Sequence, residues 1–368
     1  MNPLVELHAY GQSFWYDNIR RKFLQDGTLQ SLIAEDGLRG MTSNPSIFEK
    51  AIGHSDDYDA QIRELVAAGA NADTVYEALV LTDIQAACDL FADLYAESEG
   101  GDGFVSLEVS PHLARNTAET ISEAKRLFAA VNRPNLMIKV PATPEGIPAI
   151  QELIGAGINI NITLMFSMAH YEAVAEVYMD GLNQLLANGG DPSKVASVAS
   201  FFVSRVDTAV DKKLDDLGDS AAQALLGKIA VANSKVVYQR FKEIFHSEAF
   251  QKLQTAGAAR QRLLWASTSA KNPNYPDTLY IDDLVGPETV NTMPPKTIDA
   301  FRDHGTLANK LEEDVDQAQS VLDNLAALHI NLDEITAQLQ EDGVIAFAKS
   351  FDALMETIET KRKEMAAV

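Results

Sequence analysis

The sequence has a single cysteine, Cys88, and no apolar run of membrane-spanning length. One cysteine excludes an intrachain disulfide and a cysteine-based metal site, and we interpret it as a small packed hydrophobe. The seven histidines form no His-x-His or His-x-x-x-His pair, so a metal site has no sequence support. The N-terminus lacks the basic and apolar segments of a secretory signal. We therefore expect a cytoplasmic, metal-free and cofactor-free protein with no membrane segment.

Positive charge is also scarce. Lysine and arginine number 30 against 53 aspartates and glutamates, which gives a formal net charge of −23. This balance disfavours nucleic acid or an anionic membrane as a partner, because both require basic surfaces. A protein of this charge that handles an anionic substrate must concentrate its few cations locally.

Short apolar runs alternate with longer amphipathic patterns, which is typical of parallel βαβ units. The candidate strands span residues 13–17, 37–42, 103–109, 135–141, 158–164, 195–202, 262–268 and 278–283. Eight strands favour a TIM (β/α)8 barrel over a doubly wound sheet. The helical patterns between the strands include 56–68, 72–98, 115–131, 145–155, 167–188, 205–217, 219–247 and 248–256. Residues 272–298, rich in proline and asparagine, predict mostly loop.

The end of the chain is helical and charged. Helices are predicted over 306–329, 331–341 and 343–366, and no strand follows them. The sequence thus predicts a barrel domain over 1–304 and C-terminal helices over 305–368 that pack on the barrel. A separate helical domain is the alternative, although no Pro/Gly/Ser linker precedes it. A monomer and a homodimer both remain open.

Lys139 is the most informative residue, because it lies near the end of the short apolar strand predicted over 135–141. Lysine is depleted in strands and is almost never buried without a partner. One interpretation is an edge lysine that keeps strands from associating. The other is a desolvated amine with a lowered pKa, able to attack a carbonyl and form a Schiff base.

Other strand ends carry polar side chains. Asn159, Asn161 and Thr163 share one face of a strand whose other face is isoleucine, which predicts a polar barrel interior or, alternatively, a solvated face. Glu108 and Asp17 each end an apolar strand and are either proton-handling carboxylates or salt-bridge partners.

Three strand-to-helix junctions add hydroxyls, an amide and cations. Thr42-Ser-Asn-Pro-Ser46 follows the second strand; Asn44 is held extended by the next proline and can point into the barrel, while Ser46 can cap the helix. Ser200-Phe-Phe-Val-Ser-Arg205 ends the sixth strand and enters a helix, and Trp265-Ala-Ser-Thr-Ser-Ala-Lys271 does the same after the seventh. Loops after the last strands of such barrels frequently bind phosphate. A surface salt bridge from Arg205 to Asp207 or Asp211 is the alternative.

Two of these segments resemble signatures of the transaldolase family. Thr42-Ser-Asn-Pro-Ser46 is similar to its Thr-[Ser/Thr]-Asn-Pro signature, and Ile138-Lys-Val-Pro-Ala-Thr-Pro-Glu-Gly-Ile147 to its Schiff-base lysine signature. They occur in the family's order, and the resemblance covers about residues 10–290. It implies a metal-free barrel enzyme that moves a dihydroxyacetone unit from sedoheptulose 7-phosphate to glyceraldehyde 3-phosphate, giving erythrose 4-phosphate and fructose 6-phosphate.

The resemblance also implies roles for individual residues. Lys139 would be the nucleophile, Asp17 the acid/base at the substrate hydroxyl, and Glu108 and Thr163 the holders of a proton-shuttling water. The substrate-binding residues would be Thr42, Asn44, Asn161, Ser200, Phe202 (near the lysine), Arg205, Ser267, Ser269 and Lys271. Transaldolases typically carry an arginine two residues after the serine that corresponds to Ser267; here that position is Ser269, and Lys271 is the candidate replacement.

Two alternatives stand beside this interpretation. An aldolase of the same superfamily would release free dihydroxyacetone instead of transferring it. A catalytically silent sugar-phosphate-binding protein would lack the lysine or a carboxylate, yet Lys139, Asp17 and Glu108 are all present.

Overall fold

The computed structural model describes residues 2–366 and has a closed barrel at its centre. All neighbouring strands are parallel and follow one another in chain order, and the last strand pairs with the first. The strands are β1 (Gln12–Asp17), β2 (Gly40–Thr42), β3 (Phe104–Glu108), β4 (Leu136–Pro141), β5 (Ile160–Met165), β6 (Ser197–Phe202), β7 (Arg262–Ala266) and β8 (Thr289–Met293). This is a TIM barrel, so the predicted fold class is confirmed.

The prediction of the eighth strand over 278–283 was wrong. Residues Leu279–Asp282 form a short helix, α15, and β8 lies later, in a segment predicted as loop. β8 reads Thr-Val-Asn-Thr-Met, and all five residues are buried. Thr289 on this strand is hydrogen-bonded inside the protein: Gln12 donates to Thr289 Oγ1 at 2.9 Å, and the Thr289 hydroxyl donates to the Gly286 carbonyl at 2.6 Å. A strand with so few apolar residues escapes a search for apolar runs.

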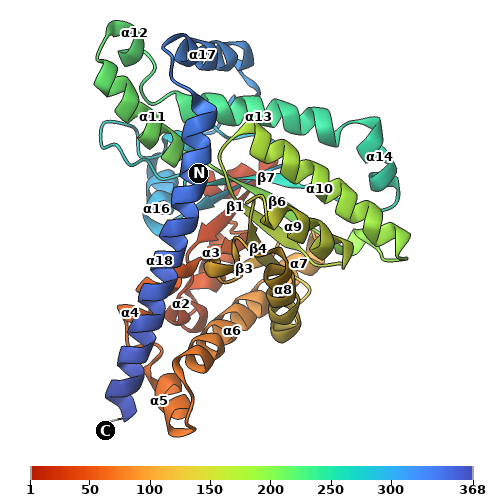
Figure 1. Ribbon diagram of the computed structural model, residues 1–368, viewed down its shortest axis with the longest axis vertical. Coiled ribbons are helices and arrows are strands. Elements are labelled where there is room, and N and C mark those ends of the chain that lie inside the picture. Colours follow the sequence, from red (N-terminus) through yellow and green to blue (C-terminus); the bar gives the residue numbers. More distant parts are fainter. Residues whose placement is uncertain (1, 367–368) are drawn as a thin grey trace.

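Helices surround the barrel, as Figure 1 shows. Before β3 lie α1 (Pro3–Glu6), η1 (Leu7–Tyr10), α2 (Arg21–Gln25), α3 (Thr28–Glu35), α4 (Pro45–Gly53), α5 (Asp59–Ala67), α6 (Ala72–Leu90) and α7 (Ala92–Glu97). Between β3 and β6 lie η2 (Pro111–Leu113), α8 (Thr117–Val131), α9 (Gly146–Gly155), α10 (Met168–Ala187) and η3 (Pro192–Lys194). After β6 follow α11 (Ser204–Leu217), α12 (Ser220–Gln223), α13 (Ile229–Phe245) and α14 (Glu248–Thr255). The predicted helices 72–98 and 219–247 are therefore each two helices.

The C-terminal region differs from its prediction at two points. After α16 (Pro295–His304), residues 306–314 hold only the short η4 (Lys310–Glu312), and α17 starts later (Val315–Ala327). The predicted helices 331–341 and 343–366 are one helix, α18 (Leu332–Ala366), which continues through Gly343. The missing side chain of Gly343 makes room for Leu164, because a Cβ there would lie 2.8 Å from Leu164 Cδ2.

α18 runs nearly the length of the molecule across the barrel (Figure 1) and packs against α4, α5, α6 and α11. It also contacts β5, so the C-terminal helix reaches the sheet itself. The division of the chain at residue 304 into two domains stays a prediction.

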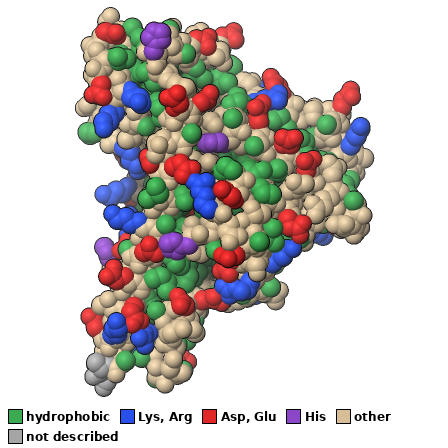
Figure 2. Space-filling view, in the orientation of Figure 1, with side chains coloured by type: hydrophobic (Ala, Val, Ile, Leu, Met, Phe, Trp, Pro, Cys, Tyr) green, Lys and Arg blue, Asp and Glu red, His purple; other side chains and the backbone are tan. Residues whose placement is uncertain are grey.

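The surface carries both signs of charge. Acidic and basic side chains are interspersed over the face shown in Figure 2, with hydrophobic side chains between them. Cys88 is buried, as expected for a packed hydrophobe. Among residues 2–366, no helix has the length and apolar character needed to cross a membrane.

Candidate active site

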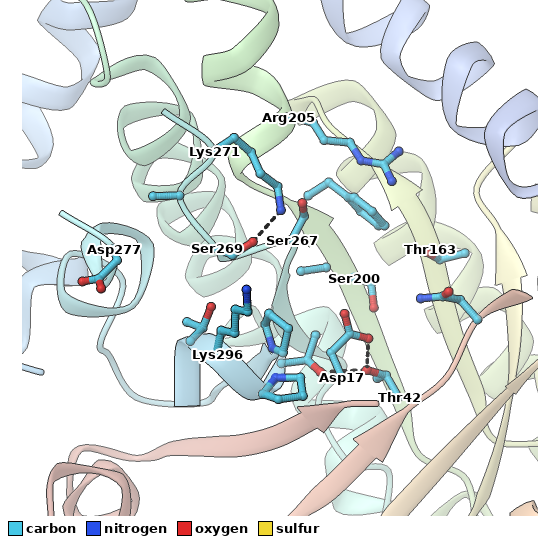
Figure 3. A pocket seen from close by; sticks show the side chains of 18 of the residues that line it. Asp17, Thr42, Thr163, Ser200, Arg205, Ser267, Ser269, Lys271, Asp277 and Lys296 are labelled. Atoms are coloured by element: carbon cyan, nitrogen blue, oxygen red, sulfur yellow. Dashed lines mark hydrogen bonds between the residues drawn. The ribbon is translucent and has the colours of Figure 1, made fainter. Parts of the chain in front are cut away.

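A cavity of about 780 Å³ opens at the carboxyl ends of the strands. Parallel barrels place their active sites at this end, because the loops after the strands converge there. Figure 3 shows labelled side chains from several strand ends pointing into it. Of the predicted site residues, eleven line it: Asp17, Thr42, Asn44, Lys139, Thr163, Ser200, Phe202, Arg205, Ser267, Ser269 and Lys271. Glu108 and Asn161 lie buried beside Lys139.

Strand register brings the lysine, a carboxylate and an amide to one level of the barrel. Glu108 on β3 pairs with Lys139 on β4, which pairs with Asn161 on β5. Lys139 Nζ lies 3.3 Å from Glu108 Oε2, and the two side chains are only 6% and 5% exposed. The amine also donates to the Ser43 carbonyl at 3.3 Å. Lys139 is thus a buried, paired lysine, and the edge-strand interpretation does not hold.

The polar face of β5 points into the barrel. Asn161 Nδ2 donates to Ser106 Oγ at 2.9 Å, and the Ser200 hydroxyl donates to Asn161 Oδ1 at 2.6 Å. These bonds join β3, β5 and β6 across the interior and fix the orientation of the Asn161 amide. Thr163 Oγ1 is buried but has no hydrogen-bond partner among the described residues, and the contact of Glu108 Oε2 is its ion pair with Lys139. Both oxygens have lone pairs left that can accept a hydrogen bond from a bound molecule.

Asp17 faces the same cavity from β1. The Thr42 hydroxyl donates to Asp17 Oδ1 at 2.8 Å, as drawn in Figure 3, and Thr42 Oγ1 lies 2.7 Å from Thr292 Oγ1. Burial raises the pKa of Asp17 and of Glu108 above the usual carboxyl range, and the Lys139 charge only partly offsets this. A carboxyl with a raised pKa holds its proton closer to neutral pH, which suits proton transfer.

Asn44 both lines the cavity and caps a helix. Its side-chain oxygen accepts from the Ile47 amide at 3.0 Å, so Asn44 caps α4. The prediction that Ser46 could cap this helix was wrong, since the Ser46 hydroxyl instead donates to Ser350 Oγ on α18 at 2.7 Å.

The outer part of the cavity is cationic. Arg205, at the start of α11, and Lys271, after β7, point into it from one side (Figure 3). Lys271 Nζ donates to Ser269 Oγ at 2.5 Å, and Ser267 Oγ lies 3.0 Å from Ser204 Oγ. Burial and the neighbouring Arg205 charge lower the pKa of Lys271. These are the concentrated cations that an acidic protein needs for an anionic substrate.

Arg205 does not form either surface salt bridge considered from the sequence. Its guanidinium carbon lies 5.1 Å from the Phe202 ring centroid and 5.9 Å from that of Phe347. Phe202, predicted to lie near the lysine, packs on this arginine. Asp211 instead accepts from the Tyr275 hydroxyl at 2.7 Å and from the Gly227 amide at 3.1 Å.

Asp207 is a buried carboxyl outside the cavity, and its raised pKa leads us to expect a stability that depends on pH. It accepts from the Ala230 amide at 2.7 Å and the Tyr280 hydroxyl at 2.8 Å, and burial raises its pKa to about 6. Between about pH 4 and pH 6 the Asp207 carboxyl is ionised in the unfolded chain but still protonated in the folded protein. The free energy of unfolding therefore falls by about 3 kcal/mol as the pH rises through that window. Asp207→Asn should remove this slope. Urea unfolding of both proteins from pH 4 to pH 7 measures it.

The matched control for this measurement is Asp216→Asn, which changes an exposed carboxyl on the same helix. Its stability should keep the pH slope of the wild type. A constant difference between wild type and Asp207→Asn at every pH would contradict the assignment.

Lys296 and Phe347 are among the cavity residues that were missed from the sequence. Lys296 lies at the start of α16, in a segment predicted as loop, and Phe347 lies in α18, far along the chain from every strand. No spacing rule relates either residue to the motifs at the strand ends. Among residues 2–366, no cluster of three or more histidine, cysteine, aspartate or glutamate side chains is arranged to hold a metal ion.

Comparison with known proteins agrees with this site. The family described as Transaldolase/Fructose-6-phosphate aldolase matches residues 14–358. The chain is 45% identical to the transaldolase of Trichodesmium erythraeum, over 100% of this chain and 99% of that protein. It is 48% identical to the transaldolase of Thiobacillus denitrificans, over 97% of this chain and 100% of that protein. The chain therefore belongs to the transaldolase/fructose-6-phosphate aldolase family.

Proposed function

We propose that the protein is a transaldolase that transfers a dihydroxyacetone unit from sedoheptulose 7-phosphate to glyceraldehyde 3-phosphate, giving erythrose 4-phosphate and fructose 6-phosphate. The observation that carries this proposal is the buried Lys139, 3.3 Å from Glu108, inside a cavity lined farther out by cations. Full-length relatives that bear the name transaldolase support transfer over simple aldol cleavage.

The first step joins the substrate carbonyl to Lys139. The amine must be neutral to attack, and Glu108 is close enough to take its proton. Burial raises the pKa of Glu108 and so favours its protonated form, which is the form that the carboxyl reaches when it takes the proton of the amine. Nitrogen adds to the carbonyl carbon, and the resulting carbinolamine then loses its hydroxyl as water to leave an iminium. We assign the protons of this step to Glu108 and a water held between it and Thr163.

The second step breaks a carbon–carbon bond. Asp17, held by Thr42, removes the proton of the substrate hydroxyl carried by the carbon at the far end of the bond that breaks. That oxygen becomes the carbonyl of the departing aldehyde phosphate, and the bonding electrons flow into the iminium to give an enamine. No metal is required, because the nitrogen of Lys139 accepts the electrons.

The remaining residues hold the substrate. Asn44, Asn161 and Ser200 are assigned to the hydroxyls of the three-carbon unit. We assign the phosphate to Arg205, Ser267, Ser269 and Lys271. The enamine then adds to the acceptor aldehyde, Asp17 returns the proton, and hydrolysis at Lys139 frees the new ketose.

Acceptor dependence tests this function. With fructose 6-phosphate as donor, turnover should require an aldehyde phosphate such as erythrose 4-phosphate, and the product should be sedoheptulose 7-phosphate. The measurement is sugar-phosphate production followed by chromatography, with and without acceptor. Steady release of free dihydroxyacetone at a comparable rate without acceptor would identify the aldolase instead.

We further propose that the enzyme works in the cytoplasm, as a monomer or homodimer and without nucleic acid. The acidic composition disfavours nucleic acid as a partner and supports this setting.

A further inference from the structure

α18 contributes one face to the active site. Gln340, Gly343 and Phe347 are spaced three and four residues apart, so they lie on the same side of the helix. All three contact the carboxyl ends of the barrel strands or the side chains in the cavity. The exposed Ile345, at 64% relative exposure, marks the opposite, solvent-facing side.

Gln340 fixes the helix to the barrel. Its side-chain amide donates to the Ala142 carbonyl and to the Leu164 carbonyl, both at 2.9 Å. Leu164 has a left-handed backbone (φ 60°) where the register between β5 and β6 shifts. The buried amide thus satisfies one carbonyl just after β4 and one in the irregular part of β5, and it holds α18 against the ends of these two strands.

Gly343 lets the helix come close at this point. A Cβ at Gly343 would lie 2.8 Å from Leu164 Cδ2 and 3.6 Å from Arg205 Nη1. The Arg205 guanidinium therefore lies directly against the helix backbone. Any larger residue at Gly343 would push Leu164 or the helix away.

Phe347 then contacts both functional cations. Its ring centroid lies 5.9 Å from the Arg205 guanidinium carbon and 5.6 Å from Lys139 Nζ. Phe202 contacts Arg205 from β6, at 5.1 Å. Among the described residues, no carboxylate pairs with Arg205, so the two rings orient the guanidinium while all its N–H donors stay free for a phosphate.

We propose that Phe347, carried by the C-terminal helix, is a positioning residue that holds Arg205 with Phe202 and thereby sets the preference for phosphorylated sugars. This inference rests on the proposed transaldolase function of the same cavity. It gives the C-terminal helix a role in substrate selection.

The test distinguishes the contribution of the aromatic ring of Phe347 from that of a buried apolar side chain of similar size. Phe347→Leu and Phe347→Met keep a buried apolar side chain but remove the ring, whereas Phe347→Tyr keeps the ring. Loss of a desolvated cation–π contact weakens binding about 5- to 30-fold. The inhibition constant of inorganic phosphate should rise by that factor in the leucine and methionine variants and recover in the tyrosine variant.

Donor preference provides a second measurement. The ratio of kcat/KM for fructose 6-phosphate to that for fructose should fall 5- to 30-fold in Phe347→Leu, mainly through KM. The matched control is Phe351→Leu, one turn later on α18, where the ring packs edge-on against Tyr76 and His112. It should leave this ratio and the phosphate inhibition constant unchanged.

Two results would overturn the inference. One is an unchanged phosphate inhibition constant in both Phe347→Leu and Phe347→Met; the other is an equal loss of kcat/KM for fructose and fructose 6-phosphate. Either result in a wild type that transfers dihydroxyacetone leaves the proposed function standing. A wild type that forms no adduct with fructose 6-phosphate and borohydride overturns the function and this inference together.

Discussion

Lys139→Ala is expected to lower kcat/KM for transfer by at least about 10⁴-fold, because the covalent intermediate can no longer form. Incubation of the wild type with fructose 6-phosphate and borohydride should add a three-carbon unit to the peptide that contains Lys139. Peptide mapping by mass spectrometry locates the adduct. The position of the adduct must be mapped because two other lysines, Lys271 and Lys296, also line the cavity.

The variant also leaves Glu108 buried without its partner, so a charge-preserving variant is needed beside it. Lys139→Arg keeps a cation opposite the carboxylate but cannot form the Schiff base, and it should be as inactive as the alanine variant. Lys125→Ala removes an exposed lysine that pairs with Glu152 at 3.1 Å and should retain wild-type activity. An adduct on Lys271 or Lys296 in the active wild type would contradict the assignment of Lys139 as the Schiff-base lysine.

The sequence predicted the barrel where strands are apolar and bounded by clear turns. β4 and β6 lie within one or two residues of their predicted limits, 135–141 and 195–202. β8 was missed because it has few apolar residues and is buried all the same; its Thr289 is hydrogen-bonded by the distant Gln12, which no local pattern reveals. The apolar residues around Tyr280 and Ile281 were mistaken for that strand, although they bury one side of a single helical turn.

The residues of the candidate site could be predicted where they lie on or directly after a strand. Alternation along β5 placed Asn161 and Thr163 on the polar face, and that face points into the barrel. Phe347 could not be found this way. It enters the cavity only because α18 folds back over β5 from more than a hundred residues along the chain, guided by contacts of Gln340 and Gly343. Such long-range packing leaves no signal in one sequence.

Asp17→Asn is expected to change the adduct that borohydride traps on Lys139 and to lower the turnover number of the enzyme. Loss of a positioned acid/base should lower kcat about 10²- to 10⁴-fold. Schiff-base formation depends on Glu108, 3.3 Å from the amine, and should survive. The donor would then bind covalently but not split. Borohydride should trap the whole six-carbon sugar phosphate on Lys139 in this variant, where the wild type yields the three-carbon unit.

Asp211→Asn is the matched control for this experiment, because burial raises the pKa of Asp211 as it does that of Asp17. Asp211 accepts hydrogen bonds from Tyr275 and the Gly227 amide, at 2.7 and 3.1 Å, and does not line the cavity. Its variant should trap the three-carbon unit, as the wild type does. Glu108→Gln should differ from both, with slow formation of any adduct, because the proton of Lys139 has lost its nearest acceptor. If Asp17→Asn trapped only the three-carbon unit at the wild-type rate, carbon–carbon cleavage would need another base, and the assignment of Asp17 would be wrong.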